Sequence, residues 1–361
     1  MKKILINGNF LCRSLTGIER FAFEICARLD EILAEETVPP VKFSILAPAN
    51  AAELPDYKRI EIIPAKYLTS FPRWDIFHFP KMCRKLSAVA LNFSNTAPVG
   101  KSCGFAFLHD IYAFDFPEDF TSPRDRLIRA YSLFHYRNIA RNARRILTVS
   151  RFSKGRIREA YGVDESRISV IPNGWDHFKS VEADDRIFER FPILLEREFF
   201  FTLGSLQKRK NLAWILDYAG KHKDQLFAVS GKRIGGMSPR ELSGLTALKN
   251  VLLLGYVSDG EVKSLMGKCR AFVFPSYYEG FGIPPLEALS AGARIIVARA
   301  ASLPEIYGDS ARYIDAGDTD CDLEELAGSP MEAGEAERVL SEFTYKKSAN
   351  MLYNVIKEEM L

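Results

Sequence analysis

The sequence has 361 residues, of which 47% are hydrophobic and 26% charged, with a formal net charge of +3. This length exceeds one ordinary core and predicts about two domains of roughly 150 residues each. So small a net charge gives no argument by itself for a nucleic-acid-binding protein, and no uninterrupted apolar run approaches the ~18 residues of a membrane span.

The first residues, MKKILINGNF, have too short an apolar run for a signal peptide and predict a first β-strand instead. The six cysteines are scattered, with no CxxC pair and no nearby histidine to complete a metal site. We interpret them as reduced, mostly structural thiols of a cytosolic protein. They are Cys12, Cys26, Cys83, Cys103, Cys269 and Cys321.

Short β-branched and aromatic runs alternate with longer amphipathic stretches along the chain. The predicted strands of the first half span 2–7, 43–48, 76–79, 88–94, 104–110, 145–150 and 168–172. Those of the second half span 198–204, 226–231, 250–256, 271–276 and 294–298. Predicted helices between them include 18–35, 123–142, 152–161, 211–221 and 259–268. Nearly continuous apolar strands in this alternation predict an α/β protein with βαβ units and doubly wound parallel sheets.

Residues 175–197 interrupt this rhythm, because they carry mixed charge and no strand pattern. We therefore place a domain boundary in this segment and divide the chain into residues 1–180 and 181–343. Residues 344–361 form a further helix that can cross back to the first domain. Two Rossmann-like domains facing each other would turn their strand C-termini toward a shared central cleft, the usual ligand position in such sheets.

The segment FPSYYEGFGIPPLEALSAG, residues 274–292, predicts a strand, a glycine-rich loop and a proline-started helix. Glycines permit close backbone approach, and a helix N-terminus favours an anion such as a diphosphate. Glu287, placed in the first helical turn, would accept hydrogen bonds from ribose hydroxyls, and Glu279 from those of a sugar ring. These residues predict a sugar-nucleotide ligand. The alternative is an ordinary strand–helix connection whose glutamates only cap and solvate.

At this point the sequence resembles a known family, the retaining glycosyltransferases of family 4 with the two-domain GT-B fold. The resemblance covers nearly the whole chain in ordered blocks and extends the segment above to SYYEGFGIPPLEALSAGARIIVARAASLPEIYGDSARYID. In the second half, FTLGSLQKRKNL and LLGYVSDGEVKSLMGKCRAFVFPS are similar to the family's diphosphate loop and to the stretch before the paired glutamates. In the first half, NGNFLCRSLTGIERFAFEI, FLHDIYAFDFPEDF and RILTVSRFSKGRIREAYGVDESRISVIPNGWD resemble the family in order and spacing.

The resemblance implies an acceptor-binding first domain and a second domain that binds the nucleotide sugar. Glu279 is then expected to contact the transferred sugar and Glu287 to hold the ribose. The backbone around Phe281 and Gly282 would face the sugar and phosphates, and Gly280 and Ile283 are assigned to the same donor site.

Lys210 matches the family's lysine on the leaving diphosphate, where a fixed cation favours the transition state over the ground state. Many family members carry an arginine directly after the strand glycine, but this sequence has Ser205 there. Arg209 is our choice for the second cation, with Lys208 and Lys232 as alternatives. Without the resemblance, a KRK run would be interpreted as a solvated loop.

In the first domain, His109 follows a buried-looking strand and matches a family histidine near the donor sugar and the reaction centre. A structural histidine is the alternative, and Asp110 could either orient the ring or cap the next element.

Gly17 matches the family's flexible loop near the diphosphate and acceptor, whereas an ordinary helix start at Thr16 with Glu19 as its capping-box partner is also open. Glu19 and Arg20 are assigned to the acceptor.

Residues 124–158 contain eleven Arg and Lys and one acid, with interleaved aromatic residues. This segment is interpreted either as a surface for anionic lipid and a lipid-diphosphate acceptor or as a solvated basic face of amphipathic helices.

The hypothesis is a retaining hexosyltransferase that moves mannose from GDP-mannose onto a lipid-linked or growing polysaccharide, without a metal and by front-face attack. It would be cytoplasmic, with possible contact to the inner face of the membrane. Three alternatives stay open: a UDP-sugar donor (glucose, galactose or N-acetylglucosamine), a nucleotide-sugar epimerase, and a non-catalytic protein that binds membrane or nucleic acid.

Overall fold

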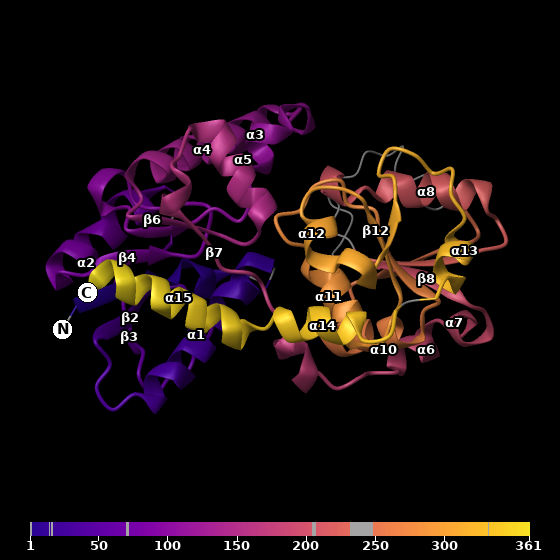
Figure 1. Ribbon diagram of the computed structural model, residues 1–361, viewed down its shortest axis with the longest axis horizontal. Coiled ribbons are helices and arrows are strands. Elements are labelled where there is room, and N and C mark those ends of the chain that lie inside the picture. The colour runs from indigo at the N-terminus through magenta and orange to yellow at the C-terminus, as the bar shows by residue number, and fades with distance from the viewer. Residues whose placement is uncertain are drawn as a thin grey trace. The chain divides into compact units, whose positions relative to one another are not determined.

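A computed structural model describes residues 2–13, 15, 17–69, 72–203, 207–231, 248–330 and 332–361. The chain divides into two compact units (Figure 1). Unit 1 comprises Met1–Gly174 and Thr344–Leu361, and unit 2 comprises Trp175–Phe343. The boundary predicted between residues 180 and 181 thus falls slightly later than the division observed after Gly174.

Unit 1 is built on a seven-stranded parallel sheet with the order β3-β2-β1-β4-β5-β6-β7. Its strands are β1 (Lys2–Asn7), β2 (Val41–Ala47), β3 (Glu61–Pro64), β4 (Val89–Asn92), β5 (Phe105–Phe107), β6 (Arg145–Thr148) and β7 (Ile168–Val170). Its helices are α1 (Gly17–Glu35), α2 (Phe79–Leu86), α3 (Tyr112–Asp115), α4 (Pro123–Asn142), α5 (Arg151–Tyr161) and α15 (Tyr345–Met360).

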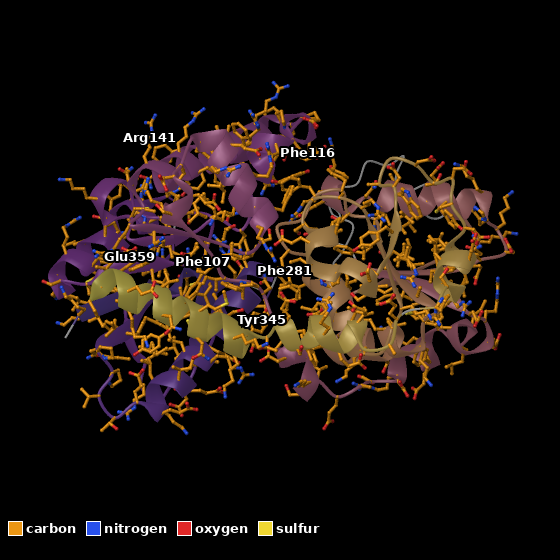
Figure 2. All side chains as sticks on the ribbon, viewed as in Figure 1. Phe107, Phe116, Arg141, Phe281, Tyr345 and Glu359 are labelled. Carbon is orange, nitrogen blue, oxygen red and sulfur yellow. The ribbon has the colours of Figure 1, made fainter. Side chains whose placement is uncertain are left out.

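Helices cover both faces of this sheet. This is seen from alternate residues of one strand, which pack in different apolar clusters. Ile4 and Ile6 of β1 pack with α1 and α15, whereas Leu5 between them packs with α2. Figure 2 labels Phe107 and Tyr345, which share the α1 and α15 cluster. An ion pair between Arg145 and Glu359 further ties α15 to this unit.

Unit 2 has a six-stranded parallel sheet with the order β10-β9-β8-β11-β12-β13. Its strands are β8 (Phe199–Leu203), β9 (Leu226–Ser230), β10 (Val251–Gly255), β11 (Ala271–Phe274), β12 (Ile295–Ala298) and β13 (Arg312–Ile314). Its helices are α6 (Arg186–Arg190), α7 (Ile193–Glu196), α8 (Leu212–Lys221), α10 (Asp259–Lys268), α11 (Ile283–Ser290), α12 (Leu303–Tyr307), α13 (Leu323–Gly328) and α14 (Glu335–Glu342). Two parallel-sheet, Rossmann-like domains confirm the predicted fold class.

The strand predicted at 76–79 is wrong. These residues belong to a π-helical turn, Trp74–His78, that continues into α2. Trp74, Phe79 and Cys83 are buried along one side, whereas Phe77 is 62% exposed. The short apolar run therefore belongs to a half-buried helix and not to a strand.

Candidate active site

The candidate site of unit 2 lies where the strand order changes direction. From β8 the chain adds β9 and β10 on one side, and β11 pairs with β8 on the other. The loops after β8 and β11 therefore leave neighbouring parallel strands at the same carboxyl edge of the sheet. Such a switch point is where ligands of open α/β sheets bind.

These two loops are held together by hydrogen bonds. The carbonyl of Arg209 accepts a hydrogen bond from the N–H of Tyr277 at 3.0 Å, and its oxygen lies 2.8 Å from the hydroxyl oxygen of Ser276. Asn211, in the left-handed conformation with φ 58°, donates its side-chain amide to the carbonyl of Pro275 at 3.1 Å. The turn Lys208–Lys210 is thereby fixed beside the glycine-rich loop.

Glu279 lies at the centre of a buried ionic cluster. Its Oε1 accepts hydrogen bonds from Lys210 Nζ and from the hydroxyl of Ser276, each at 2.6 Å. Arg209 Nη1 lies 3.5 Å from the other carboxylate oxygen. The structure thus brings together three predicted site residues, and the side chain of Glu279 is only 7% exposed.

The cations decide the ionisation of this carboxyl group. Burial alone would raise the pKa of Glu279, but the charges of Lys210 and Arg209, with hydrogen bonds from Lys210 and Ser276, hold it below its usual value. Two cations and one carboxylate leave the cluster with a net charge of about +1 at neutral pH. This excess positive charge at a sheet edge suits an anionic ligand.

The loop beside this cluster depends on glycine at one position. Gly282 has a φ of 91°, and a Cβ there would lie 2.6 Å from Leu303 Cδ2. The following helix α11 begins at Ile283, one residue earlier than predicted, and prolines follow. Prolines have no N–H, so any anion at this helix start would bind to the N–H groups of Phe281, Gly282 and Ile283. In the described chain, none of these three donates to a backbone carbonyl.

Glu287 lies deeper in α11 than predicted. It is the fifth residue of the helix, and the first turn contains no acidic residue, so the placement in the first turn is wrong. Its Oε1 lies 3.0 Å from Nε2 of His177, and both side chains are almost fully buried. His177 belongs to the short helix Asp176–Ser180, whose position is fixed by Lys263, which donates to the carbonyls of Phe178 and Val181.

Other side chains hold the glycine-rich loop, and sequence analysis did not identify them. The buried hydroxyl of Ser302 lies 2.9 and 3.2 Å from the carbonyl oxygens of Glu279 and Phe281, which share its single proton. The hydroxyl of Tyr307 donates to the carbonyl of Gly282. The family block quoted above contains both residues, but it gave neither a role, because their contacts cross more than twenty positions of sequence.

In unit 1, His109 follows β5 and is 6% exposed. Its Nε2 lies 2.6 Å from the carbonyl of Phe93. A carbonyl only accepts hydrogen bonds, so Nε2 carries the proton and Nδ1 of the neutral ring is an acceptor. Burial lowers the pKa of His109, against smaller opposing effects of the Phe93 carbonyl, Asp110 and Glu19, and favours this neutral form.

The other first-domain predictions concern the start of two helices. Gly17 is the first residue of α1, and Glu19, two residues on, is buried with its carboxylate 3.4 Å from Arg13. Arg20 is half-buried. Asp110 accepts a hydrogen bond from the N–H of Tyr112 at 3.0 Å, as the capping alternative requires.

A buried polar network lies at the strand-order change of unit 1, between β1 and β4. Asn7, the last residue of β1, donates to Asp75 at 2.9 Å and to Asn92 at 3.2 Å, and accepts from Trp74 at 2.7 Å. Thr96 donates to the other oxygen of Asp75 at 3.1 Å. The network fixes the loops that surround this edge of the sheet.

Ser205, Lys232 and Thr16, which entered the sequence-based alternatives, lie outside the described residues. Among the residues that the structure does describe, no group of three or more His, Cys, Asp or Glu side chains is placed to hold a metal ion. In the same residues, no helix is both long and apolar enough to cross a bilayer.

Comparison with protein families gives one match to each half of the chain. Residues 16–177 match the family described as Glycosyltransferase Family 4. Residues 183–346 match the family described as Glycosyl transferases group 1. The two matches meet near the division between the units.

Two curated relatives match the chain in part. The O-antigen chain mannosyltransferase RfbU of Salmonella typhimurium is 31% identical over 215 residues, 58% of this chain and 56% of the relative. The O-antigen chain mannosyltransferase B of Escherichia coli is 29% identical over 234 residues, 59% of this chain and 57% of the relative. The match thus spans little more than half of each relative's length.

Among solved structures, sucrose-phosphate synthase from Thermosynechococcus elongatus aligns with a TM-score of 0.72 and 14% identity, covering 99% of both chains. At this identity the likeness shows the fold alone.

Proposed function

Because the chain belongs to the glycosyltransferases that these two family models describe, we propose that it transfers a hexose from a nucleotide sugar to a glycan acceptor. The observation that carries the proposal is the cluster of Lys210, Arg209 and Glu279 at the switch point of unit 2. It lies beside backbone N–H groups at the start of α11, which together with the cations suit a diphosphate.

The proposed donor is GDP-mannose, and the proposed acceptor is a lipid-linked or growing polysaccharide. The support is that the two curated relatives described above are mannosyltransferases of O-antigen chains. A UDP-sugar donor is the alternative that the experiment below distinguishes.

The cations contribute most when the bond to the leaving group breaks. Negative charge then grows on the diphosphate, and Lys210 and Arg209 are already fixed by Glu279 and the backbone carbonyl of Tyr278. Such preorganised donors stabilise the transition state without reorganising. This cationic pair takes the role that a metal has in other transferases, so the proposed reaction needs none.

Neither predicted catalytic group is suited to act as a general acid near neutral pH. Glu279 is held ionised by its cations, and His109 is held neutral with its proton on Nε2. In the proposed retaining reaction, the leaving phosphate accepts the acceptor's proton during front-face attack, while Glu279 orients the sugar.

A thermal-shift panel of GDP, UDP, ADP, CMP and dTDP, each with and without EDTA, tests the donor and the metal requirement. Ligand at about 100 times its Kd should stabilise the protein by about 2.7 kcal/mol. A shift with GDP alone that EDTA leaves unchanged supports the proposal. A shift with UDP alone overturns the assignment of GDP-mannose as the donor.

Incubating the candidate nucleotide sugar with and without glycan acceptor then tests the activity. Transfer should require acceptor. Isomerisation of the donor without acceptor would indicate an epimerase instead. No turnover of any donor would refute the proposal that the protein is an enzyme.

A further inference from the structure

One face of helix α4 is exposed along most of its length and carries no acid. Counting about 100° per residue, seven positions fall within a stripe about 100° wide, and five of them, all but Pro123 and Ala130, carry a large side chain. They are Arg126, Leu127, Phe134, Arg137 and Arg141, which we call the α4 stripe.

The side chains of the α4 stripe are available to a partner. Leu127 is 72% and Phe134 is 45% exposed, and the three arginines are exposed as well. Within the described parts of the chain, no ion pair engages these three guanidinium groups. Figure 2 labels Arg141 at the outer edge of its unit.

The opposite face of the same helix is fixed in the core of unit 1. His135, Tyr136 and Ile139 are buried there, and Asn138 donates to the carbonyl of Pro98 at 2.9 Å. The helix therefore cannot turn to bury Leu127 and Phe134 without breaking this packing. Its one acid, Asp125, lies off the stripe and is engaged by the N-cap residue Ser122.

We propose that the α4 stripe docks on an anionic lipid surface. Arginines that form no ion pair attract headgroup phosphates, and two exposed apolar side chains between them can enter the boundary of headgroups and acyl chains. A nucleic-acid backbone would use the cations and leave Leu127 and Phe134 in water. The surrounding segment 124–158 reinforces this charge, since eleven basic residues against one acid give a local net charge of about +10. The proposal goes beyond glycosyl transfer and does not rest on it.

Co-sedimentation tests the proposal with vesicles of phosphatidylcholine alone and of an equimolar mixture with phosphatidylglycerol. The wild-type protein should bind the mixed vesicles and bind pure phosphatidylcholine far more weakly. Arg137→Gln with Arg141→Gln should weaken binding about twenty-five-fold, at roughly fivefold for each cation near such a surface. Leu127→Ser with Phe134→Ser should weaken the binding that persists at high salt, because screening does not affect apolar insertion.

A matched control changes the same number of charges elsewhere in unit 1. Lys81 and Lys85 are exposed and lie four positions apart on α2. Lys81→Gln with Lys85→Gln should leave vesicle binding nearly unchanged, and thermal unfolding of every variant checks that the fold is retained. Equal weakening by this control would attribute binding to overall charge and overturn the proposal. Binding of duplex DNA but not of mixed vesicles would also overturn it, as would unchanged binding by the Leu127 and Phe134 variant.

Discussion

Removing Lys210 tests the ionic cluster on which the proposed function depends. Lys210→Ala deletes a 2.6 Å charge-assisted hydrogen bond between side chains that are 16% and 7% exposed. Breaking a fully buried pair typically costs about 3–5 kcal/mol, because the remaining charge is left buried. Here Arg209, at 3.5 Å, and Ser276, at 2.6 Å, still contact Glu279, so we expect a smaller loss of about 2–3 kcal/mol in unfolding free energy.

The loss should depend on pH with a definite sign. The folded pKa of Glu279 lies below its usual value of about 4.5, so its ion pairs stabilise the fold above that pH. This stabilisation disappears as the pH falls through the folded value. Urea unfolding of the wild type and Lys210→Ala should therefore differ most near neutrality and converge in acid.

The same variant should lose turnover by about 10²–10³, the usual effect of removing one preorganised donor to developing negative charge. Lys208→Ala is the matched control, since it removes the same charge from the same short turn. If Lys210→Ala kept wild-type stability at pH 7 and the same thermal shift with GDP, neither the ion pair nor the diphosphate role assigned to Lys210 would stand. Equal losses of stability and turnover in Lys208→Ala would mean that the effect comes from removing any positive charge from this turn and not from the contact of Lys210 with Glu279.

Three further changes probe single contacts of unit 2. His177→Ala should weaken nucleotide binding about tenfold by releasing Glu287, with turnover at saturating donor largely kept, and His177→Gln should restore part of the affinity. If calorimetry gave His177→Ala the same nucleotide affinity as the wild type, His177 would have no positioning role. Ala301→Gly should raise the unfolding free energy by roughly 0.5–1 kcal/mol, because Ala301 has a φ of 51°, and urea unfolding that shows no gain would contradict this strain. Gly282→Ala should lower it by more than about 1 kcal/mol through its φ of 91° and the contact with Leu303, and an unchanged Tm would mean that the loop adapts.

The strands that the sequence predicted best are those buried on both faces of the sheets. β8, β11 and β12 are nearly continuous apolar runs, and this pattern can be recognised without any knowledge of their neighbours. The unpredicted strands, β3 and β13, are short edge strands with half-exposed residues, so they lack that signal. The helical segment 74–86 was not predicted, because the short run at 76–79, three apolar residues and a histidine, fits a strand or a helix equally well.

Single residues of the site were predictable where chemistry or a motif marked them, but their partners were not. Glu279, Lys210 and Glu287 were identified from the loop pattern and the family resemblance. The contact of Lys210 with Glu279 spans 69 positions, and that of His177 with Glu287 spans 110. Only the strand order, which places β8 beside β11, explains why the first pair meets.

The strand order also explains why a serine and a tyrosine far from the glutamates belong to the site. β12 pairs with β11, so the chain that leaves β12 returns beside the loop that leaves β11. Ser302 and Tyr307, which follow β12, then reach three carbonyls of residues 279–282. These bonds turn the carbonyls toward α12, and a backbone held in this way presents its N–H groups in a fixed direction. The preorganisation that the proposed transfer requires thus depends on residues that need not contact the sugar nucleotide.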